Sequence, residues 1–253
     1  RHNIIISTKG GTLPHKTLFM PQNFTKHYLE KSLNKSLKRL NTDYIDLYQL
    51  HSPKISDILQ NDTLETLASF KKSGKIRHIG ISARTPEDCK YFLKLKDIDS
   101  IQINFNIIDQ RIRENKIIEL AIKKKVGIIA RTPLAFGFLT DKVDLKKLDK
   151  KNDHRTLFPS RQIKIWQNSP NFFKHLFKKK YSSTEFCLRY CLDFKGITSV
   201  IPGMKEKKEV AENINATFKP SLSKNTLKEI ANIYKKNKFF LKNLKGVKDK
   251  KNN

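Results

Sequence analysis

The chain has 253 residues, of which 38% are hydrophobic and 30% are charged. This length suits one α/β domain, and the hydrophobic fraction excludes a disordered chain. The formal net charge of +28 would ordinarily indicate nucleic acid or an anionic membrane as a partner. The lysines are spread over the whole sequence alongside abundant Asn and Ile, so we attribute the charge to coding composition. We therefore expect no specific nucleic-acid site.

The cysteines, histidines and apolar runs set further limits. Cys89, Cys187 and Cys191 make neither an even disulfide framework nor a metal-binding set, which fits a reduced, cytoplasmic compartment. The seven histidines are scattered without metal-ligand spacing, so we expect no metal. No apolar run approaches the roughly 18 residues of a membrane span, and the start at Arg1 is unlike a signal peptide. The sequence does not indicate an oligomeric state.

Strand and helix patterns alternate along the chain. Short apolar runs predict strands at residues 4–8, 45–50, 76–82, 100–104, 126–130 and 197–201. Helical spacing and capping signals predict helices at about 23–40, 62–73, 86–95, 114–125, 182–192, 206–215 and 223–236, the first capped by Asn23. Such alternation is typical of a parallel sheet, whose strands, the first included, are expected to be buried on both faces.

Two segments depart from this alternation. Residues 138–180 form a long irregular loop with one short helix near 161–167, and loops of this length are usually functional or mobile. Residues 244–253 form a lysine-rich tail that we expect to be frayed. Neither segment indicates a second domain, so we interpret residues 1–253 as a single domain.

Two predicted strands end in residues that suggest chemistry. Lys9 closes the first strand, and His51 closes the second within Leu50-His51-Ser52-Pro53. Active sites of α/β barrels are built at the carboxyl ends of parallel strands, where these two side chains would meet. The structural alternatives are a lysine that extends from the strand end to solvent and a histidine that only packs.

Five further motifs, in order along the chain, accompany this pair. They are Gly74-Lys75-Ile76-Arg77-His78-Ile79-Gly80-Ile81-Ser82, Gln102-Ile103-Asn104-Phe105-Asn106, Thr132-Pro133-Leu134-Ala135-Phe136-Gly137-Phe138-Leu139, Ile201-Pro202-Gly203 and Glu212-Asn213. With Lys9 and His51, the chain resembles the aldo-keto reductase superfamily over almost its whole length. The resemblance implies a (β/α)8 TIM barrel, of which about six βα units are present here, the N-terminal two being absent.

The resemblance also implies catalytic roles. His51 would hydrogen-bond and polarise a substrate carbonyl, and Lys9 would lower the pKa of a catalytic tyrosine. In the family that tyrosine and an aspartate come from the first two strands, for which we see no counterpart, so activity of this chain alone is an open question. Tyr44 and Tyr48 are poor substitutes.

Cofactor contacts follow from the same resemblance. Ser82 and Gln102 would hold the nicotinamide carboxamide, and Arg131 would stack under the ring, where many members have an aromatic residue. The alternatives are a turn serine, a strand glutamine and a surface ion pair. Ala83 stands where many members have Asn, so one carboxamide contact is in doubt. The other implied contacts are Pro133, Leu134 and Gly137 over the pyrophosphate, Gly203 and Lys205 at the 2′-phosphate, and Glu212 and Asn213 at the adenine.

These residues imply an NADPH-dependent oxidoreductase that reduces an aldehyde or ketone to an alcohol by hydride transfer. NADH is the alternative cofactor, because a single lysine is weak evidence for a 2′-phosphate in so basic a chain. The missing Gly-x-Gly-x-x-Gly fingerprint agrees with a barrel rather than a Rossmann sheet. The alternative functions are a dinucleotide-binding barrel without turnover and a basic polyanion-binding module. The sequence does not identify the carbonyl substrate.

Overall fold

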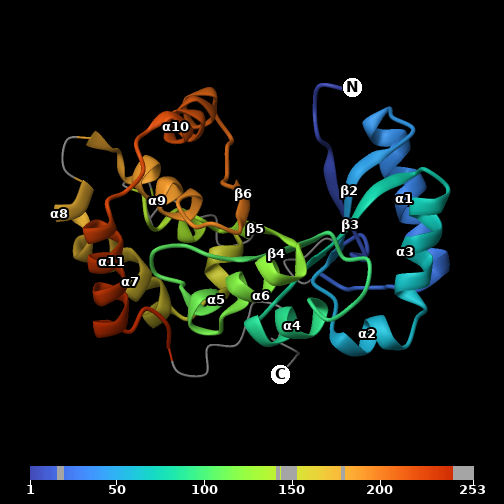
Figure 1. Cartoon of the computed structure of the whole chain (residues 1–253), viewed down its shortest axis with the longest axis horizontal. Coiled ribbons are helices and arrows are strands. Elements are labelled where there is room, and N and C mark those ends of the chain that lie inside the picture. The colour runs from blue at the N-terminus through green and yellow to red at the C-terminus, as the bar shows by residue number, and fades with distance from the viewer. Residues whose placement is uncertain (16–19, 141–142, 144–152, 178–179, 242–253) are drawn as a thin grey trace. The chain divides into compact units, whose positions relative to one another are not determined.

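The computed structural model describes residues 1–15, 20–140, 143, 153–177 and 180–241. Within them the strands are β1 (Ser7–Gly10), β2 (Ile45–His51), β3 (Ile76–Ser82), β4 (Ser100–Asn104), β5 (Gly127–Arg131) and β6 (Ile197–Ile201) (Figure 1). The α-helices are α1 (Lys26–Leu40), α2 (Ile55–Leu59), α3 (Thr63–Lys72), α4 (Pro86–Phe92), α5 (Arg111–Glu114), α6 (Ile117–Lys124), α7 (Ser160–Asn168), α8 (Lys174–Phe177), α9 (Ser183–Leu192), α10 (Lys207–Phe218) and α11 (Lys224–Lys236). The 3-10 helices are η1 (Ala135–Gly137), η3 (His154–Leu157) and η4 (Ser169–Phe172).

The six strands form one sheet in the order β1-β2-β3-β4-β5-β6. The pairs β1·β2, β2·β3 and β3·β4 are parallel. The predicted α/β class is thus confirmed, and among the described residues the sheet is open, with β1 and β6 at its two ends. The strands predicted at 76–82, 100–104 and 197–201 have the observed bounds, while most helix ends differ by a few residues.

The chain folds as two compact units. Among the described residues, the first unit comprises 1–15, 20–103 and 115–129, and the second comprises 104–114 and those from 130 to 241. The first therefore holds β1 to β3, most of β4 and the helices α1 to α4 and α6. The second holds β6, α5 and the helices from α7 onward.

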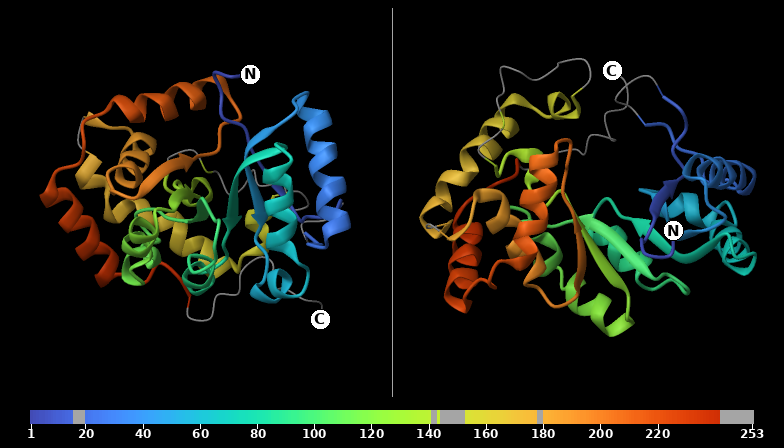
Figure 2. Two further views of the ribbon diagram at one scale, coloured as in Figure 1. Left: turned by 45° about the vertical axis from the view of Figure 1, so that its right-hand side comes forward. Right: turned by 90° about the horizontal axis from the view of Figure 1, so that it is seen from above.

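In the first unit, one face of the sheet is apolar and is covered by helices. Helices α1 and α3 lie side by side and pack against the strands (Figure 2). Leu33 of α1 and Phe70 of α3 are buried there, and the Tyr48 ring meets the Phe70 ring edge-on at 6.3 Å. A Cβ at Gly10 would lie only 1.9 Å from the Tyr48 hydroxyl oxygen, so this close approach requires glycine. Burial of these large side chains stabilises the layer.

The opposite face of the same strands is polar. Side chains alternate along a strand, so the residues that flank Tyr48 and Leu50 of β2 point the other way. These residues are Leu47, Gln49 and His51, so this face of β2 is polar from Gln49 onward, and Gln49 is 1% exposed. At paired positions of a parallel sheet the side chains share a face, which places the polar side chains of the neighbouring strands beside them. They are Ser7, Lys9, Ser82, Ser100 and Gln102.

The first strand differs from its prediction. The apolar run was expected to pair over residues 4–8 and to be buried on both faces, but β1 begins at Ser7, and Ile4 and Ile5 are 58% and 85% exposed. The hydrogen-bonded pairing with β2 sets the start of β1, because this pairing begins at Ser7 and Leu47. The other side of β1 carries no strand among the described residues, so nothing there covers Ile4 and Ile5. The cap of α1 also differs, being Thr25 rather than Asn23.

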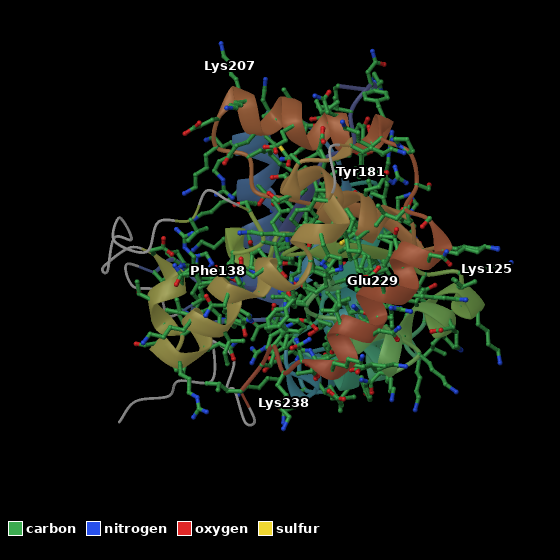
Figure 3. All side chains as sticks on the ribbon, turned by 90° about the vertical axis from the view of Figure 1, so that its left-hand side faces the viewer. Lys125, Phe138, Tyr181, Lys207, Glu229 and Lys238 are labelled. Atoms are coloured by element: carbon green, nitrogen blue, oxygen red, sulfur yellow. The ribbon has the colours of Figure 1, made fainter. Side chains whose placement is uncertain are left out.

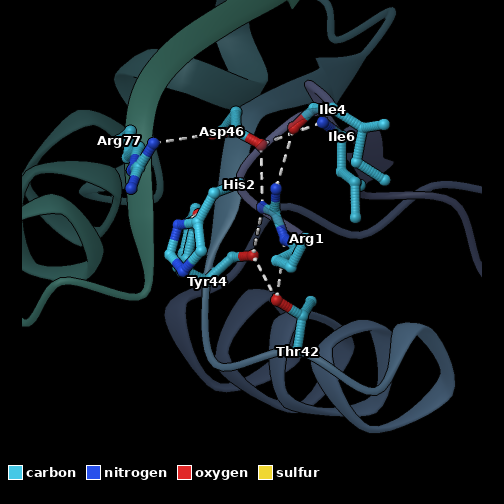
Figure 4. A network of polar contacts seen from close by, with 8 residues as sticks. All are labelled: Arg1, His2, Ile4, Ile6, Thr42, Tyr44, Asp46 and Arg77. Atoms are coloured by element: carbon cyan, nitrogen blue, oxygen red, sulfur yellow. Dashed lines mark hydrogen bonds and ion pairs between the residues drawn. The ribbon is translucent and has the colours of Figure 1, made fainter.

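A charged network holds this end of the unit (Figure 4). Asp46 is buried and forms ion pairs with Arg1 at 2.7 Å and Arg77 at 3.1 Å. The guanidinium groups of Arg1 and Arg77 each lie 4.0 Å from the centroid of the Tyr44 ring. Burial acts to raise the Asp46 pKa, but hydrogen bonds from Ile6 and Arg1 and the charges of both arginines lower it on balance. The carboxylate is therefore held ionised.

The second unit has an aromatic core. The Trp166 ring, on α7, contacts the rings of Phe136, Phe138, Phe158 and Phe240 at centroid distances of 4.8 to 5.8 Å. Helix α7 confirms the short helix predicted near 161–167. Helices α2, α5 and α8 and the 3-10 turns were not predicted, because three to five residues are too few to show a helical period.

Parts of two predictions lie outside the described residues. In the expected loop at 138–180 these are residues 141–142, 144–152 and 178–179, and the expected tail at 244–253 lies wholly outside them. On the described surface of the second unit, Lys207 on α10 and Lys238 after α11 extend outward at opposite ends (Figure 3).

Candidate functional site

Parallel register aligns four of the predicted site residues on the polar face of the first unit. His51 pairs with Ser82, and Ser82 pairs with Gln102, so three neighbouring strands present these residues side by side. Lys9 pairs with Gln49, two residues before His51, and so shares the same face. Ser82 and Gln102 are buried, while Lys9 and His51 are partly exposed. The first unit thus brings these four residues together.

The loop after β1 positions His51. The hydroxyl oxygen of Thr12 lies 2.9 Å from Nδ1 of His51, and the side-chain amide of Gln22 donates to the backbone carbonyl of His51. Thr12 and Gln22 themselves pair as an antiparallel bridge. Two contacts therefore link the loop to the end of β2, and the bridge within the loop closes the ring.

A second ring of contacts backs the first. Arg84 donates to the Gln22 side-chain oxygen at 2.6 Å and to the Ser52 carbonyl at 2.9 Å. Ser52 follows His51 with a φ of 57°, a left-handed conformation that costs free energy in a residue other than glycine. The arginine compensates by binding the carbonyl of this strained residue, so the backbone after His51 is fixed from both sides.

Below this edge, three buried polar side chains meet around a glycine. The Gln49 amide donates to the Ser7 hydroxyl at 2.9 Å and to the Gln102 side-chain oxygen at 3.3 Å. A Cβ on Gly80 would lie 2.6 Å from the Ser100 hydroxyl oxygen and 2.9 Å from Cγ of Gln49. Gly80 therefore makes the space in which Gln49 reaches Gln102.

The two tyrosines nearest His51 in sequence do not face it. Tyr48 points to the helical side of β2, and burial raises its pKa to about 12. Tyr44 precedes β2 and stacks between Arg1 and Arg77 at the opposite end of the strand (Figure 4). Neither phenol is placed to donate a proton beside Lys9 and His51.

In the second unit, Arg131 begins a tightly turned segment. Its Nε donates to the Asn104 side-chain oxygen at 2.6 Å, which holds the guanidinium group against the end of β4. Left-handed φ angles follow at Thr132, Ala135, Phe136 and Gly137. Pro133, Leu134 and Gly137, the predicted pyrophosphate contacts, all lie in or beside this turn, which includes η1.

Arg155 holds this turn from the side. Its Nη1 donates to the Phe136 carbonyl at 3.4 Å. Its Nε and Nη2 donate to the Asp153 carboxylate at 2.5 to 3.0 Å. Hydrogen bonds from Arg155 lower the Asp153 pKa to about 2. The His154 ring packs 5.2 Å from the Phe136 ring, and its pKa is lowered by burial and by the charges of Arg155 and Lys205.

The last predicted residues contact one another. The Asn213 amide, on α10, donates to the Gly203 carbonyl at 3.2 Å and so shapes the loop after β6. Glu212 accepts a 2.7 Å hydrogen bond from Ser182, and Lys205 donates its backbone N–H to Glu209. The adenine and phosphate roles of these residues stay predictions.

The donor set fits a nicotinamide dinucleotide. A carboxamide needs both donors and acceptors, which the Gln102 amide and the Ser82 hydroxyl supply on the polar face of the first unit. In the second unit, the ammonium charge of Lys205 suits a phosphate, while the Lys205 backbone N–H already donates to Glu209. No group of three or more His, Cys, Asp or Glu residues in the described part of the chain is arranged to hold a metal ion. None of the helices searched there is long and apolar enough to span a membrane.

Sequence reasoning missed several residues that support the site. They are Thr12, Gln22, Gln49, Arg84, Asn104 and Arg155. A signal for Gln49 was present, since polar residues recur at every second position of β4 and, at the end of β2, at Gln49 and His51. The loop residues carried no local signal, because their contacts join segments distant in sequence.

Comparison with known proteins is consistent across the chain. The model of the Aldo/keto reductase family matches residues 1–235. The uncharacterized oxidoreductase YqkF of Bacillus subtilis is 32% identical over 236 residues, which cover 91% of this chain and 74% of that protein. The L-glyceraldehyde 3-phosphate reductase of Escherichia coli K12 is 27% identical over 242 residues, covering 91% of this chain and 69% of that protein.

Solved structures agree. The aldo-keto reductase AKR11C1 of Bacillus halodurans, in its holo form, superposes with a TM-score of 0.75 at 28% identity, covering 92% of this chain and 74% of that one. The glycerol dehydrogenase AKR11B4 of Gluconobacter oxydans has the same TM-score at 24% identity, which shows the likeness of fold.

Proposed function

Because the chain belongs to the aldo/keto reductase family, we propose that it is an NADPH-dependent oxidoreductase that reduces an aldehyde or ketone to an alcohol. The observation that supports this most directly is the register of β1 to β4. It presents Lys9, His51, Ser82 and Gln102 on one polar face at the carboxyl end of the strands. Chemistry in α/β barrels is placed at this end.

Each residue has a role that its chemistry allows. When bound, a reduced nicotinamide supplies the hydride that reduces a carbonyl carbon. Ser82 and Gln102 hydrogen-bond the carboxamide and so fix the orientation of the ring. His51 donates a hydrogen bond to the carbonyl oxygen, where negative charge develops. The ammonium group of Lys9 stabilises that charge and lowers the pKa of a proton donor beside it.

The finer assignments belong to the same proposal. Lys205 and the loop at Gly203 bind phosphate, Glu212 and Asn213 contact adenine, and Arg131 stacks on the nicotinamide. Pro133, Leu134 and Gly137 cover the pyrophosphate. We propose a cytoplasmic enzyme whose partner is a small carbonyl compound, with no specific nucleic acid and no membrane.

The first test is cofactor binding, followed by the fluorescence of NADPH on titration with the chain. We expect Gln102→Leu to weaken binding about tenfold, the loss of roughly one well-placed hydrogen bond. Gln60→Leu, at an exposed position after α2, is the matched control and should bind as the unchanged chain does. A chain that binds neither NADPH nor NADH would refute the proposal.

The second test is turnover with a panel of small aldehydes and ketones. Lys9→Met and His51→Gln should abolish measurable reduction while NADPH binding is kept. Lys31→Met and His27→Gln, both exposed on α1, are the matched controls. Binding of NADPH without reduction of any carbonyl would instead select the reading of a dinucleotide-binding barrel without turnover.

A further inference from the structure

Thr12, which no sequence motif singled out, lies against the ring of His51. Its hydroxyl oxygen is 2.9 Å from Nδ1, a normal hydrogen-bond distance. We propose that Thr12 is a positioning residue: its hydroxyl donates to Nδ1 of His51 and so keeps the imidazole proton on Nε2. The role of Thr12 in catalysis rests on the function proposed above, in which His51 donates a hydrogen bond from Nε2–H to the carbonyl oxygen of the substrate.

The surrounding contacts fix both partners. Thr12 is held by the bridge to Gln22 and by the Tyr28 hydroxyl, which donates to the Thr12 carbonyl at 2.6 Å. On the other side, the Gln22 amide donates to the His51 carbonyl, and Arg84 fixes both Gln22 and Ser52. The hydroxyl and the ring therefore meet between two backbones that are tied together, not at the tips of mobile side chains.

The direction of the hydrogen bond follows from proton accounting. A threonine hydroxyl has one proton and two lone pairs, and each nitrogen of a neutral imidazole is either donor or acceptor. Among the hydrogen bonds of the described residues, Nδ1 of His51 is the one partner of the Thr12 hydroxyl oxygen. If Nδ1 held the ring proton, the hydroxyl proton would have no acceptor within that set. With Thr12 as donor, the pair is satisfied and Nε2 carries the proton.

A fixed tautomer has a chemical consequence. The tautomer of a histidine is set by the hydrogen bond that its other nitrogen makes. An Nδ1-protonated ring would present a lone pair at Nε2, which repels the developing oxyanion instead of stabilising it. Thr12 therefore lets a neutral His51 act as a hydrogen-bond donor through Nε2.

The tautomer can be measured directly by long-range ¹H–¹⁵N correlation of the histidine side chains in the cofactor-free chain. The chain has seven histidines, so His51 is assigned from the signals that vanish in His51→Gln. Spectra are recorded at about pH 8, above the ordinary histidine pKa of ~6.5. We expect the acceptor-type shift at Nδ1 and the protonated-type shift at Nε2.

Variants separate positioning from general stability. Thr12→Val keeps the shape and removes the donor, so the His51 nitrogen shifts should move toward a mixture of the two tautomers. Thr12→Ser restores a hydroxyl and should restore the original pattern. Thr198→Val, at an exposed position on β6, is the matched control and should leave the His51 signals in place. The backbone amide spectrum of each variant reports whether the fold is kept.

Two results would overturn the inference: an Nδ1-protonated His51 in the unchanged chain, or identical His51 shifts in Thr12→Val. Neither measurement needs cofactor. Failure of NADPH to bind would therefore refute the proposed function and leave the tautomer result standing. Where turnover is measured, Thr12→Val should lower kcat more than it raises KM for the carbonyl, and Thr12→Ser should recover the loss.

Discussion

The side-chain amide of Gln49 donates a 3.3 Å hydrogen bond to the side-chain oxygen of Gln102 in the interior of the first unit. Both residues are buried, at 1% and 4% exposure. The bond joins strands that are not neighbours, since β3 lies between β2 and β4. With its oxygen held by Gln49, Gln102 is oriented by a contact that the local sequence does not show.

This contact predicts a cofactor effect for Gln49→Leu. The variant removes the donor to Gln102 while nearly keeping the volume, so the Gln102 amide loses its fixed orientation. We expect NADPH binding, followed by its fluorescence, to weaken about fivefold to tenfold, or ~1 to 1.4 kcal/mol.

An NADPH analogue provides the control for Gln49→Leu. In the thionicotinamide analogue sulfur, a weaker hydrogen-bond acceptor, replaces the carboxamide oxygen to which the Gln102 NH₂ group would donate, so binding of this analogue depends less on Gln102. Gln49→Leu should therefore weaken binding of NADPH more than binding of the analogue. Equal losses for the two cofactors would contradict orientation by Gln49 and indicate a general effect on the fold.

Gly80→Ala should destabilise the chain. The new Cβ would lie 2.6 Å from the Ser100 hydroxyl oxygen and 2.9 Å from Cγ of Gln49, so the interior would have to move. Overpacking costs about 1 to 3 kcal/mol, which exceeds the ~0.4 to 1 kcal/mol that alanine gains through the unfolded state. The free energy of unfolding of Gly80→Ala and of the unchanged chain is measured by urea denaturation.

Two variants check this reasoning. A Cβ at Gly203 would meet nothing within 4 Å, so Gly203→Ala should be neutral or slightly stabilising. The double variant Gly80→Ala/Ser100→Ala lacks the hydroxyl that is nearest to the new Cβ. It should recover part of the lost free energy of unfolding, because the effects of substitutions at contacting residues are not additive. A double variant no more stable than Gly80→Ala would show that the strain lies elsewhere.

The sequence predicted the sheet well because its strands carry strong periodic signals. The bounds of β3, β4 and β6 were predicted correctly, and isoleucines recur along each of the three strands. Strand β1 was placed too early, because Ile4 and Ile5 read as strand residues, whereas the bounds depend on the pairing with β2. An apolar run indicates that a strand is present, but pairing with the neighbouring strand determines which of its residues belong to the strand.

The site was predicted where chemistry sits on a strand end and missed where it depends on loops. His51 and Ser82 close their strands; the strand-end pattern indicated His51, and the family resemblance indicated Ser82. The loop that carries Thr12 and Gln22 folds on itself through the bonds Leu13 N–H to Pro21 O and Asn23 N–H to Gly11 O, both 2.9 Å. Such contacts leave no periodic trace in the sequence, and they became visible only in the structure.

Asp153 should titrate with a pKa of about 2 because Arg155 donates to both of its oxygens. In Arg155→Gln, we expect this pKa to rise toward the unperturbed value of about 3.9. The pair stabilises the fold while the carboxylate is ionised, so its contribution is present above pH ~3.9 and is lost as the pH falls toward ~2. Carboxyl ¹³C shifts followed against pH give the two values, and an unchanged Asp153 titration would contradict the assignment.

The last prediction concerns alkaline pH. Burial raises the Tyr48 pKa to about 12, above the ~10 of an exposed phenol, so the folded chain holds this proton more tightly than the unfolded chain. The stability from the neutral buried phenol is fully present below pH ~10 and is lost as the pH rises toward ~12. Tyr48→Phe has no proton to lose, so its unfolding free energy should fall less steeply between these values. Tyr91→Phe, at a partly exposed position on α4, is the matched control and should keep the original slope. A Tyr48→Phe chain that loses stability as steeply as the unchanged chain would show that other groups, the lysines among them, govern alkaline unfolding.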